Sequence, residues 1–384
     1  MQHILFHRHT PWQSEIRCST NIFARLFQQD GFDVTYMQGM VNLAHVVTGT
    51  GRAQYWRSGP RHESGAWVFT PLSAVPYSRF WPFDTSLAAE MAYKTCMPSI
   101  RSQVLRSGFS EPDVIWTANP GSSALRTAFP NAKVVFQVVD YYPAFIGGNI
   151  KGIEGRDYRL ADHILVIGDT LKHYITQDHG IDPDKITVLG QGVFSENYSP
   201  ELPAPEDIAG LPSPLAVWVG VIDKCDPAMF GAVASSLKAR GGSLVMIGPR
   251  AAWADELATR CENVHLLGSR TPEQVPSYLC NADIGLMLYD QSRQEVYKGQ
   301  NPLKLYEYAA AGLPVISTDH DEYKFLNAPA IVIRDSSEVE DAIQRAIDEC
   351  DTLRERGADF IKDRSWHSVY DRARYELERV VVGL

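Results

Sequence analysis

The sequence lacks several features that would place it in a specialised class of protein. Its six cysteines include no C-x-x-C pair and no histidine spacing typical of zinc, so no disulfide framework or zinc site is expected. No run of about 18 apolar residues occurs, which leaves no candidate for a membrane-spanning helix. The first βα turn carries no G-x-G-x-x-G motif, so a nicotinamide cofactor is not indicated.

Positively charged side chains are outnumbered by negatively charged ones, 36 to 46. The net charge of −10 argues against general binding of nucleic acid. The polar start, Met1 to Arg8, does not fit a secretion signal. With isolated cysteines that read as reduced thiols, these features predict a cytoplasmic protein.

What is present is typical of a soluble α/β protein. At 384 residues, of which 45% are hydrophobic and 21% charged, the chain is long enough for two or three domains. A predicted strand at 3–7, helix at 16–29 and strand at 32–36 form a βαβ unit, and a strand at 133–139 continues the pattern. Residues 40–85 are expected to form irregular insertions with weak strands, followed by a long helix over 87–106.

A proline-rich segment at 194–214 divides the chain, and the strand–helix alternation restarts at residue 215. We therefore predict two Rossmann-like domains, at residues 1–193 and 215–365, joined by that linker. A terminal helix is expected over 366–384.

The segment 301–318 is the most informative part of the sequence. It predicts a loop, a helix beginning at Pro302, a stop at Gly312 and a buried strand. Lys304 and Glu307 would share one face of the helix near its N-terminus, where free N–H groups favour an anion such as a diphosphate. The alternative is a surface ion pair.

The run P-L-K-L-Y-E-Y-A-A-A-G-L-P-V-I-S-T resembles the nucleotide-sugar segment of GT-B glycosyltransferases with the E-x7-E motif. Glu307 stands at the position of the second glutamate of the motif, which binds the donor ribose. Gly299 stands at the position of the first glutamate, a residue that belongs to retaining enzymes of this family. The resemblance implies two Rossmann-like domains facing across a cleft, with the last helix crossing back. It also implies a donor pocket lined by the following residues: Gly220, Gly248, Gly268, Ser269, Tyr289, Asn301, Leu303, Lys304 and Glu307.

Asp140 follows the predicted strand V-V-F-Q-V-V, at the strand end where open α/β sheets bind ligands. It could act as a general base for a sugar hydroxyl, or it could be a turn residue. The runs V-V-F-Q-V-V-D and Y-K-G-Q-N-P-L-K-L-Y-E-Y are similar to the xanthan-pathway type of glucuronosyltransferase. In that inverting type, an aspartate at the equivalent strand end is the base.

Residues 51–107 hold seven positive and three negative side chains, with aromatic residues among them. This mixture suits an anionic lipid surface or a phosphorylated acceptor, or else a solvated loop. The candidate acceptor and membrane residues are His9, Trp12, Arg52, Trp56 and Arg57.

Two D-x-D pairs, at 182–184 and 319–321, are interpreted as turn aspartates, so neither a metal nor another cofactor is expected beyond the nucleotide-sugar co-substrate. His320 and Glu322 could also meet the donor sugar. The favoured function is transfer of a sugar from a UDP-sugar, possibly UDP-glucuronate, to a lipid-linked saccharide in polysaccharide or envelope synthesis. The alternatives are a UDP-sugar 2-epimerase and a non-catalytic sugar-nucleotide sensor.

Overall fold

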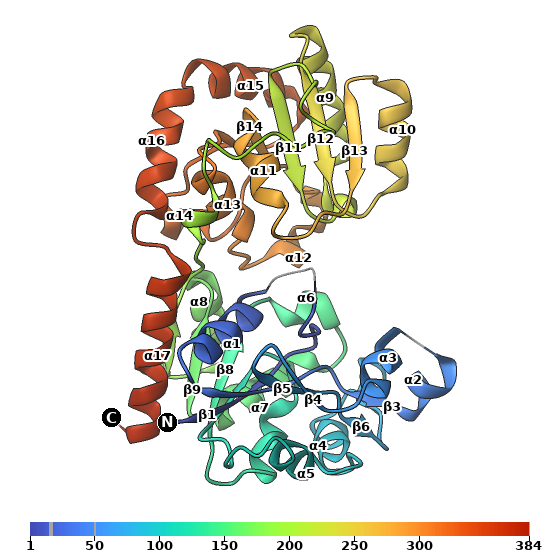
Figure 1. Ribbon diagram of the computed structural model, residues 1–384, viewed down its shortest axis with the longest axis vertical. Coiled ribbons are helices and arrows are strands. Elements are labelled where there is room, and N and C mark those ends of the chain that lie inside the picture. Colours follow the sequence, from blue (N-terminus) through green and yellow to red (C-terminus); the bar gives the residue numbers. More distant parts are fainter. Residues whose placement is uncertain (15–17, 50, 384) are drawn as a thin grey trace. The chain divides into compact units, whose positions relative to one another are not determined.

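The computed structural model describes residues 1–14, 18–49 and 51–383, and these form two compact units. Unit 1 contains Met1–Gly190 together with Tyr370–Leu384, and unit 2 contains Gln191–Val369. Each unit is built on one mostly parallel sheet with helices packed against it, so the predicted α/β class with two Rossmann-like domains is confirmed (Figure 1).

The sheet of unit 1 has eight strands in the order β10-β9-β8-β7-β1-β2-β5-β4. All neighbouring pairs are parallel except β4 with β5, which are antiparallel. Because parallel strands end at the same edge, the residues that follow them gather there. The strands are β1 (His3–His7), β2 (Asp33–Met37), β4 (Arg61–Glu63), β5 (Ala66–Phe69), β7 (Val114–Thr117), β8 (Lys133–Val138), β9 (His163–Val166) and β10 (Ile186–Val188).

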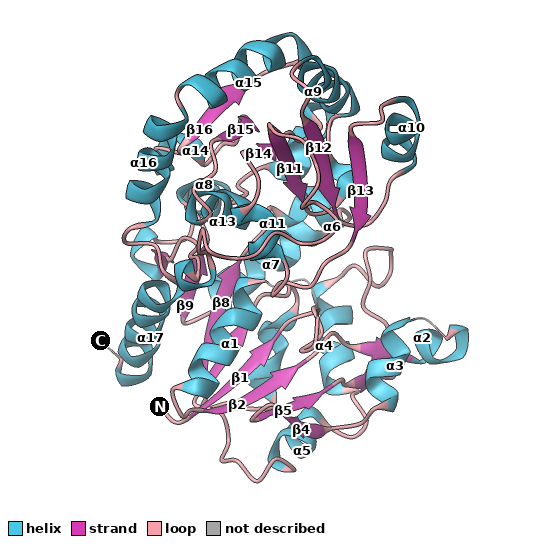
Figure 2. Ribbon diagram, turned by 45° about the horizontal axis from the view of Figure 1, so that its top comes forward, coloured by secondary structure: helices cyan, strands magenta, loops and turns pink. Residues whose placement is uncertain are grey.

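The region predicted to be irregular is more ordered than its composition suggested. It contains β4, β5, a separate pair β3 (Val41–Asn42) and β6 (Leu72–Ser73), and two short helices, α2 (Leu43–Thr48) and α3 (Gly51–Arg57). Strand β5 is buried at every position. It pairs with β2, beside which it lies in Figure 2. Four buried residues show no alternation, which is why the weak strands expected in this region could not be located from the sequence pattern.

The predicted long helix over 87–106 is wrong. The structure has two helices, α4 (Ser86–Lys94) and α5 (Ile100–Leu105). Pro98 lies between them, and a proline inside a helix removes a hydrogen bond and clashes with the preceding turn. The other helical elements of unit 1 are α1 (Ser19–Gln29), η1 (Ser122–Thr127), α6 (Tyr142–Ile146), α7 (Ile150–Leu160), α8 (Asp169–His179) and η2 (Pro183–Lys185). Residues 16 and 17, where the first helix was predicted to begin, lie outside the described residues.

Unit 2 has a six-stranded, fully parallel sheet in the order β13-β12-β11-β14-β15-β16. Helices α9 (Pro227–Ala239) and α10 (Ala252–Arg260) pack beside β12 and β13 (Figure 1). The strands are β11 (Leu215–Val219), β12 (Ser243–Ile247), β13 (Val264–Gly268), β14 (Ile284–Met287), β15 (Val315–Thr318) and β16 (Ala330–Ile333). The remaining helices are α11 (Val275–Cys280), α12 (Gln294–Tyr297), α13 (Leu303–Ala310), α14 (Tyr323–Leu326), α15 (Val339–Asp348) and α16 (Cys350–Ile361).

The segment around α13 follows the prediction closely. Pro302 is the N-cap of α13 rather than its first residue, with extended backbone angles. Gly312 lies just beyond the helix with φ +70°, a left-handed conformation that favours glycine, and β15 follows fully buried. The order helix, glycine, strand is therefore present.

The last helix, α17 (Trp366–Val382), is shared between the units, since Tyr370 onward belongs to unit 1. In unit 1 the Tyr370 hydroxyl donates to Asp30 at 2.6 Å and Arg374 pairs with the same carboxylate. Ala373 and Leu377 are completely buried. These contacts make the end of the chain part of the core of unit 1.

Candidate functional site

The loops at the carboxyl edge of the unit 2 sheet bring most of the predicted donor residues together. Gly220 follows β11, Gly248 follows β12, Tyr289 lies beyond β14, and α13 begins beside them. These strands are parallel neighbours or nearly so, which places their ends on one side of the sheet. Contacts join four of the predicted residues at this edge, namely Gly248, Gly220, Lys304 and Tyr289.

Lys304 is the centre of this cluster. Its Nζ donates to the Tyr289 hydroxyl at 2.9 Å and lies 4.6 Å from the centroid of the Trp218 ring. Burial lowers the pKa of Lys304, while the nearby Cys225 and Glu307 act in the opposite direction. A positive group held against aromatic faces and poorly hydrated is well suited to bind an anion.

Two glycines allow the close packing beside this lysine. A Cβ on Gly220 would lie 2.7 Å from Cε of Lys304, and a Cβ on Gly248 would lie 1.8 Å from the carbonyl oxygen of Gly220. Both also have φ in the region that side-chain-bearing residues rarely adopt, +137° and +148°. Glycine is therefore required at both positions for the packing seen here.

The residues flanking Lys304 have different surroundings. Asn301 is buried, and its Oδ1 accepts a hydrogen bond from the Tyr306 hydroxyl at 3.0 Å, which holds the loop before α13. Leu303 begins the helix and is partly exposed. Glu307 lies one turn beyond Lys304 and is also partly exposed. Ser269 is exposed after β13, and its carbonyl oxygen accepts from Arg270.

His320 lies beyond β15 at the same edge, in ring contact with Tyr289 at 5.2 Å. It is 4% exposed, and both ring nitrogens are buried without a hydrogen-bond partner in the described part of the chain. Burial, with a further contribution from the charge of Lys304, lowers the pKa of His320 to about 4. The imidazole is therefore neutral near pH 7. Glu322 is also buried.

In unit 1, Asp140 lies two residues beyond β8, at the carboxyl edge as predicted. Arg8, which directly follows β1, places Nη2 3.8 Å from Oδ2 of Asp140. Arg8 did not stand out in the sequence, because only the strand order β8-β7-β1 brings it near Asp140. Trp218 of unit 2 was not predicted for the same reason, since its neighbour Lys304 is distant in the sequence.

The predicted acceptor and membrane residues do not form one group. Trp12 is only 1% exposed and packs against Tyr36 and Arg25, which does not fit a role on the surface. His9 is exposed, and its backbone N–H donates to Asn119. Arg52 and Arg57 are exposed on α3, with Trp56 partly exposed between them.

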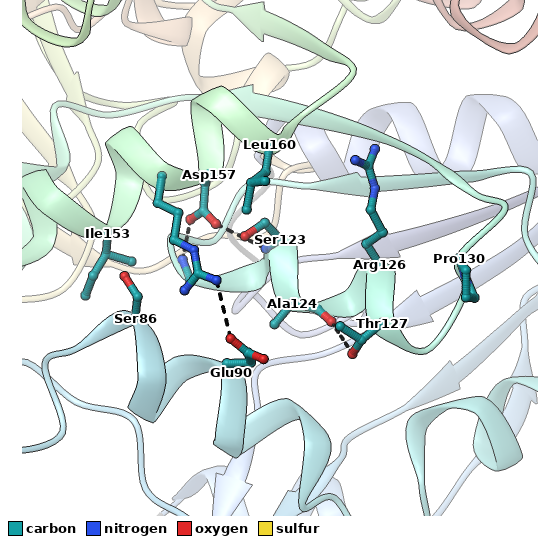
Figure 3. Close-up of a pocket in the computed structure, with 12 residues that line it drawn as sticks. Ser86, Glu90, Ser123, Ala124, Arg126, Thr127, Pro130, Ile153, Asp157 and Leu160 are labelled. Carbon is teal, nitrogen blue, oxygen red and sulfur yellow. Dashed lines mark hydrogen bonds and ion pairs between the residues drawn. The ribbon is translucent and has the colours of Figure 1, made fainter.

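Unit 1 also contains a cavity of about 280 Å³ between α4, η1 and α7. Asp157 lies in its wall, and its carboxylate accepts backbone N–H groups from Gly121, at 2.5 Å, and Ser123, at 3.2 Å (Figure 3). Burial raises the pKa of Asp157 to about 6, against the effect of these hydrogen bonds. Its evident task is to hold the turn that leads from β7 into η1.

No group of three or more histidine, cysteine, aspartate or glutamate side chains that could hold a metal ion occurs within residues 1–14, 18–49 and 51–383. Over the same residues, no helix combines the length and apolarity needed to cross a membrane.

Comparisons with known proteins concern both the fold and the segment that contains Lys304. Residues 214–349 match the family model "Glycosyl transferases group 1". Sucrose-phosphate synthase from Thermosynechococcus elongatus superposes with a TM-score of 0.70 at 14% identity, over 100% of both chains. HepE of Anabaena, solved in complex with UDP, superposes with a TM-score of 0.66 at 14% identity, over 98% of this chain and 100% of that one. The chain has a GT-B fold.

A curated relative adds information beyond the GT-B fold. TuaH of Bacillus subtilis (strain 168), which carries the name "Putative teichuronic acid biosynthesis glycosyltransferase", is 29% identical over 223 residues. The match covers 53% of this chain and 55% of TuaH, so it spans only about half of either protein. Because the relative is named for teichuronic acid, the narrower resemblance to the xanthan-pathway type stays a prediction.

Proposed function

We propose that this protein is a glycosyltransferase that moves a sugar from a UDP-sugar to a saccharide acceptor in polysaccharide synthesis. The observation that carries the proposal is the Lys304 cluster, which lies inside the segment matching the group 1 family. The names of TuaH and of the UDP complex of HepE support the choice of pathway and nucleotide.

In the proposed donor site, Lys304 binds the diphosphate and Glu307 binds the ribose hydroxyls. Negative charge grows on the diphosphate as the sugar leaves, so a poorly hydrated cation stabilises the transition state more than the ground state. No metal is needed for this role, because Lys304 and the N–H groups at the start of α13 supply the positive field.

On the acceptor side, Asp140 acts as the general base of a single displacement that inverts the anomeric carbon. Gly299, which has φ +66° and no side chain, stands where retaining relatives of the E-x7-E type have their first glutamate. A carboxylate at the end of β8 is the group that the resemblance assigns to proton removal.

The acceptor is proposed to be lipid-linked, and α2 and α3 are proposed to touch anionic lipid. Leu43 and Val47 on α2 are 55% and 86% exposed, and Arg52 and Arg57 on α3 are exposed as well. Apolar side chains beside arginines suit an interface between lipid head groups and acyl chains.

The deciding experiment incubates the protein with UDP-glucose, UDP-galactose, UDP-N-acetylglucosamine and UDP-glucuronate, each with a bacterial membrane lipid extract. Mass spectrometry should detect one lipid-linked saccharide whose mass rises by one sugar, together with released UDP. Conversion of UDP-N-acetylglucosamine to its 2-epimer without lipid would instead favour the epimerase. UDP binding without any turnover would favour the sensor.

A further inference from the structure

Arg8 and Asp140 form a pair whose spacing is suited to a third group. Their closest atoms, Nη2 and Oδ2, are 3.8 Å apart, which exceeds the limit of about 3.2 Å for a good direct N–H···O hydrogen bond. The two side chains are 16% and 29% exposed, so both reach the surface of unit 1.

Arg8 is held in place by the neighbouring strand end. Its Nη1 donates to the carbonyl oxygen of Ala118 at 3.0 Å, and the Tyr142 hydroxyl donates to the same oxygen at 2.9 Å. Ala118 is itself fixed by its backbone bond to His7, and the turn beyond it is held by Asp157. The guanidinium therefore points toward Asp140 from a rigid support.

The chemistry of the pair selects what can lie between them. Arginine can only donate hydrogen bonds and an ionised aspartate can only accept them. A hydroxyl group does both, so a single hydroxyl oxygen about 2.8 Å from each side chain would bridge the two. A phosphate or carboxylate would bring a second negative charge against Asp140, which is unfavourable.

We propose that Arg8 is a second catalytic residue, which together with Asp140 binds the acceptor hydroxyl that attacks the donor sugar. This inference rests on the proposed function. In the step, the hydroxyl proton passes to Asp140 and the oxygen forms a bond to the anomeric carbon. The bond from that carbon to the diphosphate breaks, and its electron pair leaves with UDP. Arg8 stabilises the oxygen while it loses its proton.

The test compares four variants of the full chain, using the UDP-sugar and lipid extract that give a product with the parent protein. Arg8→Gln should lower kcat for transfer by about 100- to 1000-fold, the range for a lost electrostatic donor, with UDP affinity unchanged within about twofold. Arg8→Lys should recover part of the loss, because it keeps the charge without the planar fork.

Two further variants separate catalysis from structure. Tyr142→Phe removes the other hydrogen bond to the Ala118 oxygen, so a purely structural role for Arg8 predicts similar losses in both variants. Arg126→Gln breaks a different arginine–aspartate pair of unit 1, with Asp162, and should leave kcat unchanged.

Equal losses in Arg8→Gln and Tyr142→Phe, or full activity of Arg8→Gln, would overturn the assignment of Arg8 while leaving the proposed function intact. A parent protein that transfers no sugar would overturn both. Binding of UDP is measured separately by calorimetry, so a failure of the donor site is recognised independently of Arg8.

Discussion

At the scale of single residues, Lys304 carries a charge that is poorly hydrated and held by aromatic groups. Lys304→Ala should weaken UDP binding by about 1.5–3 kcal/mol, the usual contribution of a charge-assisted hydrogen bond. Isothermal calorimetry measures this directly. The matched control is Lys238→Ala, since Lys238 is an exposed lysine on α9 paired with Glu262. Unchanged UDP affinity in Lys304→Ala would show that this lysine is only structural.

The proposed role of Asp140 as general base also predicts the stereochemistry of the reaction. Asp140→Ala should lower kcat by about 10²–10⁴, the range for a lost general base, with donor affinity nearly unchanged. Proton NMR of the product should show inversion of the donor's anomeric configuration. Retention, or a fully active Asp140→Ala variant, would remove Asp140 from the mechanism.

Asp157 is expected to make the stability of unit 1 depend on pH. Its pKa of about 6 in the folded protein exceeds the ordinary value of 3.8, so the folded state binds the proton more tightly. Its contribution to the free energy of unfolding is therefore largest below about pH 4. The contribution falls by on the order of 2–3 kcal/mol in total as pH rises to about 6, and it is constant above that.

This dependence can be isolated by comparison with Asp157→Asn, which does not titrate. Thermal unfolding of both proteins between pH 4 and pH 7 should give a difference in stability that changes below about pH 6 and is flat above it. Parallel curves over the whole range would mean that burial does not shift this carboxyl group.

At the scale of elements, the sequence predicted the features that depend only on residues close to one another in the chain. The helix and strand around Lys304, and the position of Asp140 after β8, follow from local patterns of apolar residues, proline and glycine. Arg8 and Trp218 could not be found in this way, because their neighbours come from distant strands. Helices α2 and α3 were missed because each is about two turns long.

Helix α3 gives a prediction about membrane binding. Reversing both Arg52 and Arg57 to glutamate should reduce co-sedimentation with liposomes of phosphatidylglycerol, at about 1 kcal/mol for each arginine that touches the surface. Arg61 contributes less, since it is paired with Glu63. Lys238→Glu in unit 2 is the control for a general change in charge. Co-sedimentation that does not change with these reversals, or with added salt, would identify α3 as an ordinary solvated helix.

At the scale of the whole molecule, removal of residues 370–384 should destabilise unit 1 far more than unit 2. The truncation exposes apolar positions under Ala373 and Leu377 and removes both partners of Asp30. Burying a leucine side chain is worth about 1.5–3 kcal/mol, so unit 1 should unfold at a clearly lower temperature. UDP binding should persist, because the Lys304 cluster belongs to unit 2. An equal loss of stability in both units would argue against assigning residues 370–384 to unit 1.

Because α17 supplies part of the core of unit 1, that unit consists of the first 190 residues and the last few turns of helix. A ribosome therefore finishes nearly all of unit 1 early but delivers its final helix only after the whole of unit 2. During synthesis the surface around Phe27, which contacts Tyr370, stays uncovered while roughly half of the protein is still being made. Synthesis of unit 1 therefore begins before that of unit 2 and is completed after it.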